Sequence, residues 1–354
     1  MKAFRRLLAM WLLAAAVLTG GGSLPGWPVP AGTRAAAVSP ALPDSPDLSP
    51  TPAPVRPFEV SATATALLVT ELGRGMVLFS QNADVPMPLP LANRVMTALI
   101  AIEMFSLDTQ VTISQEAAGA DDQLNLEAGM KVRMEYLLLG MLLRDSDAAA
   151  IALAEQVSGE EPLFVQEMNT RASAFQMTMT TFSNATGNPA DGQASTVGDL
   201  SRLLRYALAN GTFRTLFRTR DTPYFFQDGS SRLLTNRFSS AWSLVDGTDG
   251  ALRAGLPTGF QNSAITASSG GINLLSVVGD SREASSTSDQ GALVQGCFRA
   301  YEYALLVQAG QAWPVDEEVE GIPVEVRFNQ NVFYVRPVGQ SHVASTRYES
   351  LGPH

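Results

Sequence analysis

Apolar and polar residues recur with two different periods along the chain, and the pattern predicts strands at both ends of a helical block. Residues 64–70 and 76–80 are short apolar segments separated by the turn Gly73-Arg-Gly75, which predicts a β-hairpin. A second hairpin is predicted from residues 263–268 and 272–278, which flank another glycine turn. The sequence therefore predicts two pairs of antiparallel strands that lie far apart in the chain.

Other segments have apolar residues at every third or fourth position, which is the period of an amphipathic helix. Thr196 and Asp199 have the spacing of a capping box at a helix N-terminus. Strands at both ends of a helical block predict an α+β fold, in which one antiparallel sheet has helices on both faces. The predicted helices cover residues 92–105, 134–143, 148–157, 160–175, 200–208 and 290–308.

The C-terminal residues 312–354 have the pattern of a short β segment beyond the main predicted domain, which spans residues 58–311. Residues 322–328 and 332–338 are predicted to pair as a hairpin around Asn329-Gln-Asn331. Two strands are only marginally stable on their own. The tail is therefore expected either to pack on the main domain or to be the start of a further module.

The N-terminal residues 1–37 have the features of a bacterial export signal. A basic start precedes the apolar run Leu7–Leu18, which is short for a membrane span, and Ala35-Ala-Ala37 offers a cleavage site. Residues 38–57 contain seven prolines and are predicted to form an extended linker. The protein is therefore expected in the periplasm or on the outer face of a bacterial membrane. Any membrane attachment would come from an uncleaved N-terminal anchor.

Composition excludes several classes of function. The chain has 354 residues, and its formal net charge of −10 makes nucleic acid an unsuitable partner. The two histidines, His342 and His354, lie near the C-terminus, which excludes a Ser-His-Asp site and a histidine-rich zinc site from the body of the chain. We expect no metal and no cofactor. Cys297, the single cysteine, lies in an apolar helical pattern and is predicted to be a packing residue.

Several segments resemble, in the same order, the motifs of one enzyme family. Leu89–Ala98 is similar to P-A-S-x-T-K-x-M-T-A, and Leu138–Glu155 is similar to L-L-x-G-L-L-x-S-G-N-D-A-A-x-A-L-A-E. Further matches are Met177–Asn184, Gly187–Pro189, Ser195–Leu200, Thr235–Arg237 and Asp249–Gly255. From about Ala64 to Gln308, the chain thus resembles the serine-type D-alanyl-D-alanine carboxypeptidases, which are low-molecular-weight penicillin-binding proteins of peptidase family S11. The resemblance implies a penicillin-binding transpeptidase or β-lactamase-like fold and a role in peptidoglycan metabolism.

The resemblance places Leu91 and Arg94 at the serine and the lysine of the family motif S-x-x-K. In that family the serine forms an acyl-enzyme and the lysine accepts its proton. Leucine has no nucleophilic atom, and arginine stays protonated near neutral pH. The residues at these two positions are therefore not expected to perform the family's acylation step.

The other two family motifs are substituted as well. Asp145-Ser146-Asp147 lies at the position of S-x-N, so acids replace the serine and the asparagine, and Ser146 takes the middle position. Arg253-Ala254-Gly255 lies at the position of K-T-G, whose lysine binds the terminal carboxylate of the substrate in the family. This third segment keeps a positive charge and the glycine but loses the hydroxyl group.

The lysine count supports the loss of S-x-x-K without any alignment. The chain has two lysines, Lys2 and Lys131, and removal of the signal would leave Lys131 alone. The residue three positions earlier is Ala128, so the mature chain has no S-x-x-K sequence. One lysine also cannot supply the two that the family mechanism uses.

Three interpretations of the substituted site remain open. Arg94 and Arg253 are expected to face Asp145 and Asp147, and together they would form an ion-pair cluster that fills the cleft. Alternatively, Arg253, together with Arg94, binds a peptide carboxylate through a forked contact. In the third interpretation, the two aspartates act as an acid and base pair of the kind that glycoside hydrolases use.

These observations predict an exported pseudoenzyme of the cell envelope that binds a peptidoglycan stem peptide or another envelope protein. One alternative is an active carboxypeptidase that uses a nucleophile outside the family motifs. Another is a purely structural envelope module.

Overall fold

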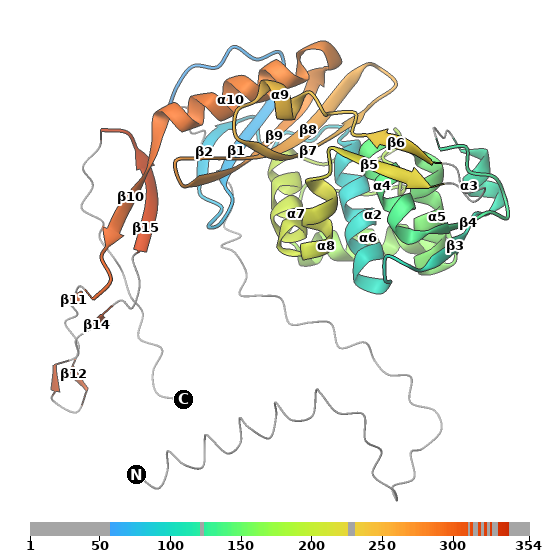
Figure 1. The fold of residues 1–354 in the computed structure, drawn as a ribbon, viewed down its shortest axis with the longest axis horizontal. Coiled ribbons are helices and arrows are strands. Elements are labelled where there is room, and N and C mark those ends of the chain that lie inside the picture. The colour runs from blue at the N-terminus through green and yellow to red at the C-terminus, as the bar shows by residue number, and fades with distance from the viewer. Residues whose placement is uncertain are drawn as a thin grey trace, which may run out of the picture. The chain divides into compact units, whose positions relative to one another are not determined.

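The computed structural model describes residues 57–120, 124–225 and 231–310, and parts of the tail at residues 312–313, 318–319, 322–323, 326–327 and 332–339. Five strands form one antiparallel sheet in the order β2-β1-β9-β8-β7 (Figure 1). The strand bounds are Ala66–Glu71 for β1, Val77–Gln81 for β2, Thr248–Gly255 for β7, Phe260–Ser269 for β8 and Ile272–Arg282 for β9. Strand β7 therefore lies at one edge of this sheet.

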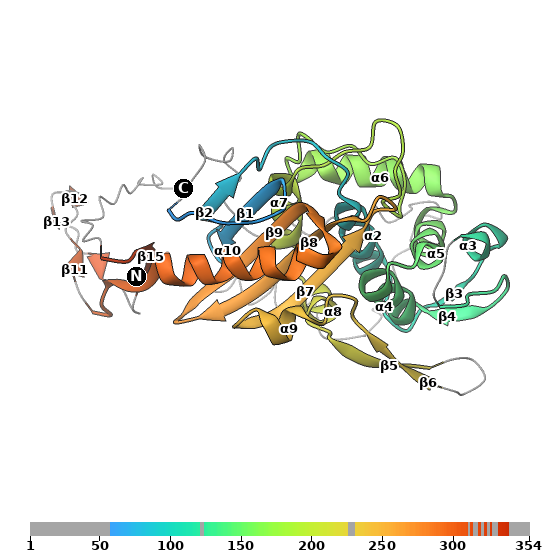
Figure 2. The same ribbon diagram turned by 90° about the horizontal axis from the view of Figure 1, so that it is seen from above.

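Helices cover both faces of the sheet. Helix α10 (Ser286–Ala300) runs across one face, and the short helix α9 (Ala241–Leu244) contacts it (Figure 2). The other described helices form a block on the opposite face, where α2 (Pro90–Met104) contacts β7 and β8 (Figure 1). That block contains α3 (Gln115–Gly119), α4 (Met134–Arg144), α5 (Asp147–Ser158), α6 (Glu161–Ala174), α7 (Val197–Ala209) and α8 (Gly211–Phe217). Two small strand pairs are β3 (Gln110–Thr112) with β4 (Lys131–Arg133), and β5 (Asp221–Phe225) with β6 (Ser231–Thr235).

Neighbouring residues on the central strands point to opposite faces of the sheet, and each face has its own hydrophobic cluster. On β1, Leu67 packs in the cluster that includes α10, whereas Leu68 packs in the cluster that includes α2. On β8, Ile265 and Ala264 divide between the clusters in the same way. Burial on both faces explains why these strands are continuous apolar runs. Cys297 lies in the α10 cluster, where burial raises the pKa of its thiol to about 12, and its predicted role as a packing residue is confirmed.

Helix α2 is buried around its whole circumference from Pro90 to Ala101. Pro90 suits the first turn, because its ring fixes a helical backbone angle and a proline has no N–H group to leave unpaired. A helix that is apolar all round belongs in the interior of a protein. Arg94 on this helix is consequently held inside the protein, where its charge needs partners.

The structure confirms the α+β class and most of the predicted elements. The two predicted hairpins are β1–β2 and β8–β9, and the helices predicted between them are α2, α4, α5, α6 and α7. Thr196 caps α7 by accepting a hydrogen bond from the N–H of Asp199 at 3.0 Å, as the spacing of the two residues predicted.

Helix α10 ends earlier than predicted. It ends at Ala300, and Tyr301–Val307 forms strand β10 where the sequence pattern predicted a helix to residue 308. Aromatic and branched side chains favour a strand in this segment. The hydroxyl group of Tyr301 also donates a hydrogen bond to the carbonyl of Leu78 at 2.8 Å, which anchors the start of β10 to β2.

The predicted pairing of residues 322–328 with residues 332–338 is wrong. Strand β15 (Val332–Pro337) pairs instead with β10, where Tyr303 stacks on Phe333 with ring centroids 5.0 Å apart. The error follows from the helix assignment of residues 301–308, which removed the true partner strand. The other tail pairs are β11 (Ala312–Trp313) with β14 (Val326–Arg327) and β12 (Glu318–Val319) with β13 (Ile322–Pro323).

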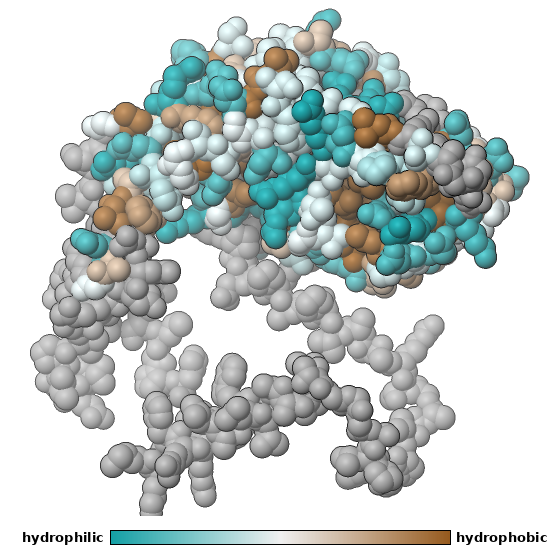
Figure 3. Space-filling view, viewed as in Figure 1, coloured by the Kyte–Doolittle hydropathy of each residue, from teal (hydrophilic) through white to brown (hydrophobic). Residues whose placement is uncertain are grey.

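The β10–β15 region carries an apolar patch on its surface (Figure 3), where Tyr303, Leu305 and Val338 are exposed.

The predicted boundary between the main domain and the tail, at residue 311, stays a prediction. The predicted signal or anchor (residues 1–37) and all of the predicted linker (residues 38–57) except its last residue lie outside the described residues. In the described ranges, no helix is both long enough and apolar enough to cross a membrane.

The loop between α6 and α7 closely approaches the start of α2 at Gly187. This glycine has a φ of +87°, and a Cβ atom there would lie 2.5 Å from the Cα atom of Pro90. We expect Gly187→Ala to lower the free energy of unfolding by about 1–2 kcal/mol for the left-handed backbone. Displacement of α2 would add about 1–3 kcal/mol to this loss. Urea denaturation measures the sum.

A matched control is Gly192→Ala in the same loop. Gly192 also has a positive φ, of +77°, but a Cβ atom there would meet no atom within 4 Å. This variant should lose only the backbone contribution. Equal losses for the two variants would contradict the close approach of the loop to α2.

Candidate functional site

Three parts of the fold meet at a cavity of about 300 Å³ beside the start of α2. Helix α2 contributes Arg94, the turn between α4 and α5 contributes Asp145 and Asp147, and the end of β7 contributes Gly255. The structure thus brings together residues from all three segments that the sequence analysis compared with the family motifs. The remaining lining residues are Asn188, Arg237, Leu256, Pro257, Gly259, Gln261 and Glu283.

The turn between α4 and α5 fixes the two aspartates by its capping interactions. Asp145 ends α4 in the left-handed conformation, with φ of 59° and ψ of 33°, which aspartate tolerates better than most residues. Ser146 is the N-cap of α5 and accepts a hydrogen bond from the N–H of Ala149 at 3.1 Å. The Ser146 side chain is thus a buried helix cap, and Asp145 and Asp147 flank it.

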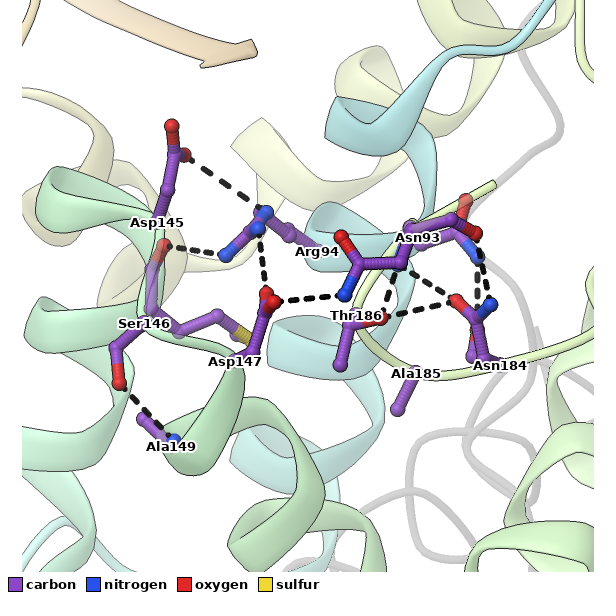
Figure 4. Close-up of polar contacts among 12 residues, drawn as sticks. Asn93, Arg94, Asp145, Ser146, Asp147, Ala149, Asn184, Ala185 and Thr186 are labelled. Carbon is purple, nitrogen blue, oxygen red and sulfur yellow. Dashed lines mark hydrogen bonds and ion pairs between the residues drawn. The ribbon is translucent and has the colours of Figure 1, made fainter. Parts of the chain in front are cut away.

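Arg94 lies between the two aspartates (Figure 4). Its Nη2 is 2.9 Å from Oδ1 of Asp147, and its Nε is 3.8 Å from Oδ1 of Asp145. The Arg94 side chain is only 4% exposed, so this is a buried ion pair. Arg237 supplies a second cation, because its Nη1 lies 2.9 Å from Oδ2 of Asp145.

Asp147 is also held by the loop between α6 and α7. The side-chain amide of Asn188 donates a hydrogen bond to Oδ2 of Asp147 at 2.7 Å. A network of amide side chains holds this loop against α2. The amide of Asn93 donates to the carbonyl of Asn184 (Figure 4) and to Oε1 of Gln193. Burial raises the pKa of Asp147 above its ordinary value, and this effect outweighs the opposing attraction of Arg94 and the hydrogen bond from Asn188.

Arg253 does not face the aspartates in the way the sequence suggested. Its Nη2 lies 3.2 Å from Oε1 of Glu283, and its guanidinium lies over the ring of Phe238 at 5.7 Å. The reason is the alternation of side chains along β7, because its neighbour Ala254 packs in the cluster that includes α2. Burial lowers the pKa of Arg253, and the positive charge of Arg237 adds to that effect. The second arginine at Asp145 is therefore Arg237 and not Arg253.

Leu91, which is expected to lie at the position of the family nucleophile, is part of the hydrophobic core. Leu91 is 1% exposed, and its backbone N–H donates a hydrogen bond to Oδ1 of Asn262 at 2.9 Å. Among the described residues, those that line the cavity include no serine, threonine, cysteine, tyrosine, lysine or histidine. Asp145, Asp147 and Glu283 carry the only charged oxygen atoms among them. The described cavity thus offers carboxylates and arginines, and no hydroxyl, thiol or amine nucleophile from a side chain.

Several buried polar atoms at this site have no hydrogen-bond partner within the described protein. They are Nε of Arg94, Oδ1 of Asp145, Nε of Arg253, Oε1 of Gln261 and Nδ2 of Asn262. Buried polar groups are normally paired, so each of these atoms needs an explanation. Two of them, Nε of Arg94 and Oδ1 of Asp145, face each other at 3.8 Å. Among the described residues, no group of three or more histidine, cysteine, aspartate or glutamate side chains is arranged to hold a metal ion.

Sequence reasoning did not assign Asn188, Arg237, Gln261 or Glu283 to the site. Asn188 and Arg237 lie in segments that resemble the family. The amide of Asn188 and the guanidinium of Arg237 can both pair with an acid, and this was the available signal that they belong to the site. Glu283 had no such signal, because it directly follows β9 and is 30 positions from its partner Arg253.

The match to known proteins covers most of the described chain. A family model described as D-alanyl-D-alanine carboxypeptidase, peptidase S11, matches residues 52–282. The chain belongs to this family. Its resemblance to S11 carboxypeptidases, inferred from the ordered motifs, is confirmed.

Individual S11 relatives are distant. The D-alanyl-D-alanine carboxypeptidase DacF of Bacillus subtilis is 27% identical over 192 residues, which cover 51% of this chain and 49% of that protein. The D-alanyl-D-alanine endopeptidase of Pseudomonas aeruginosa is 30% identical over 159 residues, which cover 44% of this chain and 51% of that protein. The chain therefore spans about half the length of these curated relatives.

Solved structures confirm the predicted fold class. Penicillin binding protein 5 from Haemophilus influenzae superposes with a TM-score of 0.67 at 21% identity, over 80% of this chain and 85% of that one. The D-alanyl-D-alanine carboxypeptidase DacD from Francisella tularensis gives a TM-score of 0.65 at 22% identity, over 82% and 85%. This S11 member thus has the penicillin-binding peptidase fold.

The raised pKa of Asp147 predicts a specific pH dependence of stability. A raised pKa means that the native state binds the proton more tightly than the unfolded chain, so stability falls as pH rises through the interval above the ordinary aspartate pKa. Asp147→Asn removes this titration. We expect the free energy of unfolding of the parent, relative to that of the variant, to decrease as pH rises from about 3.8.

Denaturation in urea at a series of pH values tests this expectation. Asp108→Asn is the control, because Asp108 is 83% exposed and its removal reports the effect of losing a surface carboxylate together with its ion pair to Arg133. A parent that instead gains stability over Asp147→Asn with rising pH would show that the pairing with Arg94 outweighs burial.

Proposed function

We propose that this protein is an exported, catalytically inactive member of the S11 carboxypeptidase family that binds a carboxylate-bearing peptide or protein segment in the cell envelope. The observation that carries the proposal is the composition of the cavity. Where the family motifs place a serine and a lysine, the chain has Leu91 in the core and Arg94 bound to Asp147.

The argument for inactivity is chemical. Acyl transfer needs a nucleophilic atom and a group that accepts its proton. Leu91 has no nucleophilic atom, and Arg94 remains protonated and is held by a carboxylate 2.9 Å away. Ser146 does not take over the task, because it is 1% exposed and its oxygen caps α5.

The argument for binding rests on the shape and the remaining donors of the site. A cavity of about 300 Å³ falls at the lower end of the volume range of ligand pockets. Strand β7 ends at this cavity and is an edge strand, which is a suitable surface for an extended peptide. Arg253, at the position of the carboxylate-binding lysine in the family, has a buried Nε without a partner.

The proposed location rests on the sequence. A basic start, an apolar run and an Ala-x-Ala site in residues 1–37 are the features of an export signal. Membership of a family named for D-alanyl-D-alanine carboxypeptidases supports a place in cell-wall metabolism.

The alternative function is a purely structural module, and the pairing of charges at the site favours it. Arg94, Arg237 and Arg253 are paired with Asp147, Asp145 and Glu283, so the formal charges of the cluster cancel. A cleft that is filled by its own ion pairs needs no ligand.

Peptide binding decides between the two functions. We expect the parent to bind N-acetyl-D-alanyl-D-alanine in a calorimetric titration and to release no D-alanine from it. Arg253→Ala should weaken binding about tenfold or more, because a hydrogen bond to a charged group contributes about 1.5–3 kcal/mol.

The control for this experiment is Arg133→Ala. Arg133 is also ion-paired, with Asp108, but Asp108 does not line the cavity, whereas Glu283, the partner of Arg253, does. No binding by the parent at millimolar peptide would favour the structural module. Release of D-alanine would show that the protein is an active enzyme with a nucleophile elsewhere.

A further inference from the structure

Glu283 stands between the proposed ligand site and its arginine. Its side chain lines the cavity and contacts Arg253, whereas Arg253 is not itself among the lining residues. Strand β9 ends at Arg282, and Glu283 begins the turn that follows, at the same end of the sheet as Gly255. The strand connection therefore delivers a carboxylate of the chain itself to Arg253.

The contact between Glu283 and Arg253 is incomplete. It joins one oxygen to one nitrogen, Oε1 of Glu283 to Nη2 of Arg253, at 3.2 Å. A carboxylate that engages a guanidinium fully accepts two parallel hydrogen bonds, which are shorter. The neighbouring donor, Nε of Arg253, is buried and has no partner in the described protein.

The two side chains also differ in exposure, and the difference decides which of them can move. The Glu283 side chain is 57% exposed, whereas that of Arg253 is 14% exposed. Glu283 can rotate into water with little loss once a ligand carboxylate takes its place at Arg253, since its own head group is already largely solvated. Arg253 is fixed against the ring of Phe238 and stays in place.

We propose that Glu283 is a resident carboxylate that occupies Arg253 until a ligand carboxylate displaces it. This inference rests on the proposed function, because it describes how the same site is regulated. A ligand carboxylate that bonds to both Nη2 and Nε gains a hydrogen bond that Glu283 does not make, which provides the driving force for exchange. A neutral group cannot replace the charge of Glu283. The site is consequently selective for free carboxylates.

The internal competitor also sets the affinity of the site. Because Glu283 is tethered next to Arg253, it competes at a high effective concentration at all times. Its removal should therefore tighten binding without any new contact to the ligand. This consequence separates a competitor from a residue that binds the ligand, whose removal weakens binding.

Glu283→Gln tests the inference, because it keeps the size of the side chain and removes its charge. We expect calorimetric titration with N-acetyl-D-alanyl-D-alanine to show about two- to fivefold tighter binding than the parent, because the variant removes a single contact made by a largely exposed carboxylate. Binding of the same dipeptide with a C-terminal carboxamide should not become tighter. Glu283→Ala should act in the same direction.

Glu167→Gln is the matched control, since Glu167 is 41% exposed, is paired with Arg171 and does not line the cavity. In an Arg253→Ala background, Glu283→Gln should lose its effect. If the parent binds the peptide and Glu283→Gln binds it equally well or more weakly, the inference is overturned and the proposed function stays intact. If neither the parent nor Glu283→Gln binds the peptide, both the inference and the proposed function fail.

Discussion

The site depends on one buried ion pair, between Arg94 on α2 and Asp147 at the start of α5. A charge taken out of water is costly unless a partner of opposite sign compensates it, and removing one partner leaves the other unpaired in the interior. The Arg94 side chain is 4% exposed and that of Asp147 is 12% exposed. Asn188, in the loop between α6 and α7, donates a hydrogen bond to the same carboxylate, so three segments of the fold meet at this pair. Buried ion pairs in proteins generally contribute little to stability or even lower it. The importance of this pair lies in its geometry, which fixes the positions of the groups that contact it.

The same pair explains how an enzyme fold accommodates a site without a nucleophile. A buried arginine in α2 requires acids nearby, and the left-handed end of α4 and the cap of α5 present Asp145 and Asp147 to it. Arg237 then balances Asp145, and Glu283 balances Arg253. The outcome is a cavity whose charges are mutually compensated, with the weakest link at the exposed Glu283.

Much of the fold was predictable because its elements are local and strongly patterned. The hairpins, the long helices and the Thr196 cap each depend on residues close in sequence. The tail was mispredicted because the apolar pattern from residue 290 to 308 fits a helix, whereas the pairing of β10 with β15 decides otherwise. At the site, the motif order located Arg94 and the two aspartates. The partner Glu283 could not be found from sequence, since its contact depends on side-chain direction across distant segments. For Arg237, the sequence offered only a basic residue in a segment that resembles the family.

The central proposal is that this protein does not perform the acylation step of its family. Intact-mass analysis of the chain from residue 38 onward, after incubation with a penicillin in large excess, tests this most directly. The account predicts an unchanged mass, because Leu91 has no nucleophilic atom and the described cavity offers no replacement. A stable adduct of one penicillin per chain would contradict it, and mapping that adduct would identify the reactive residue.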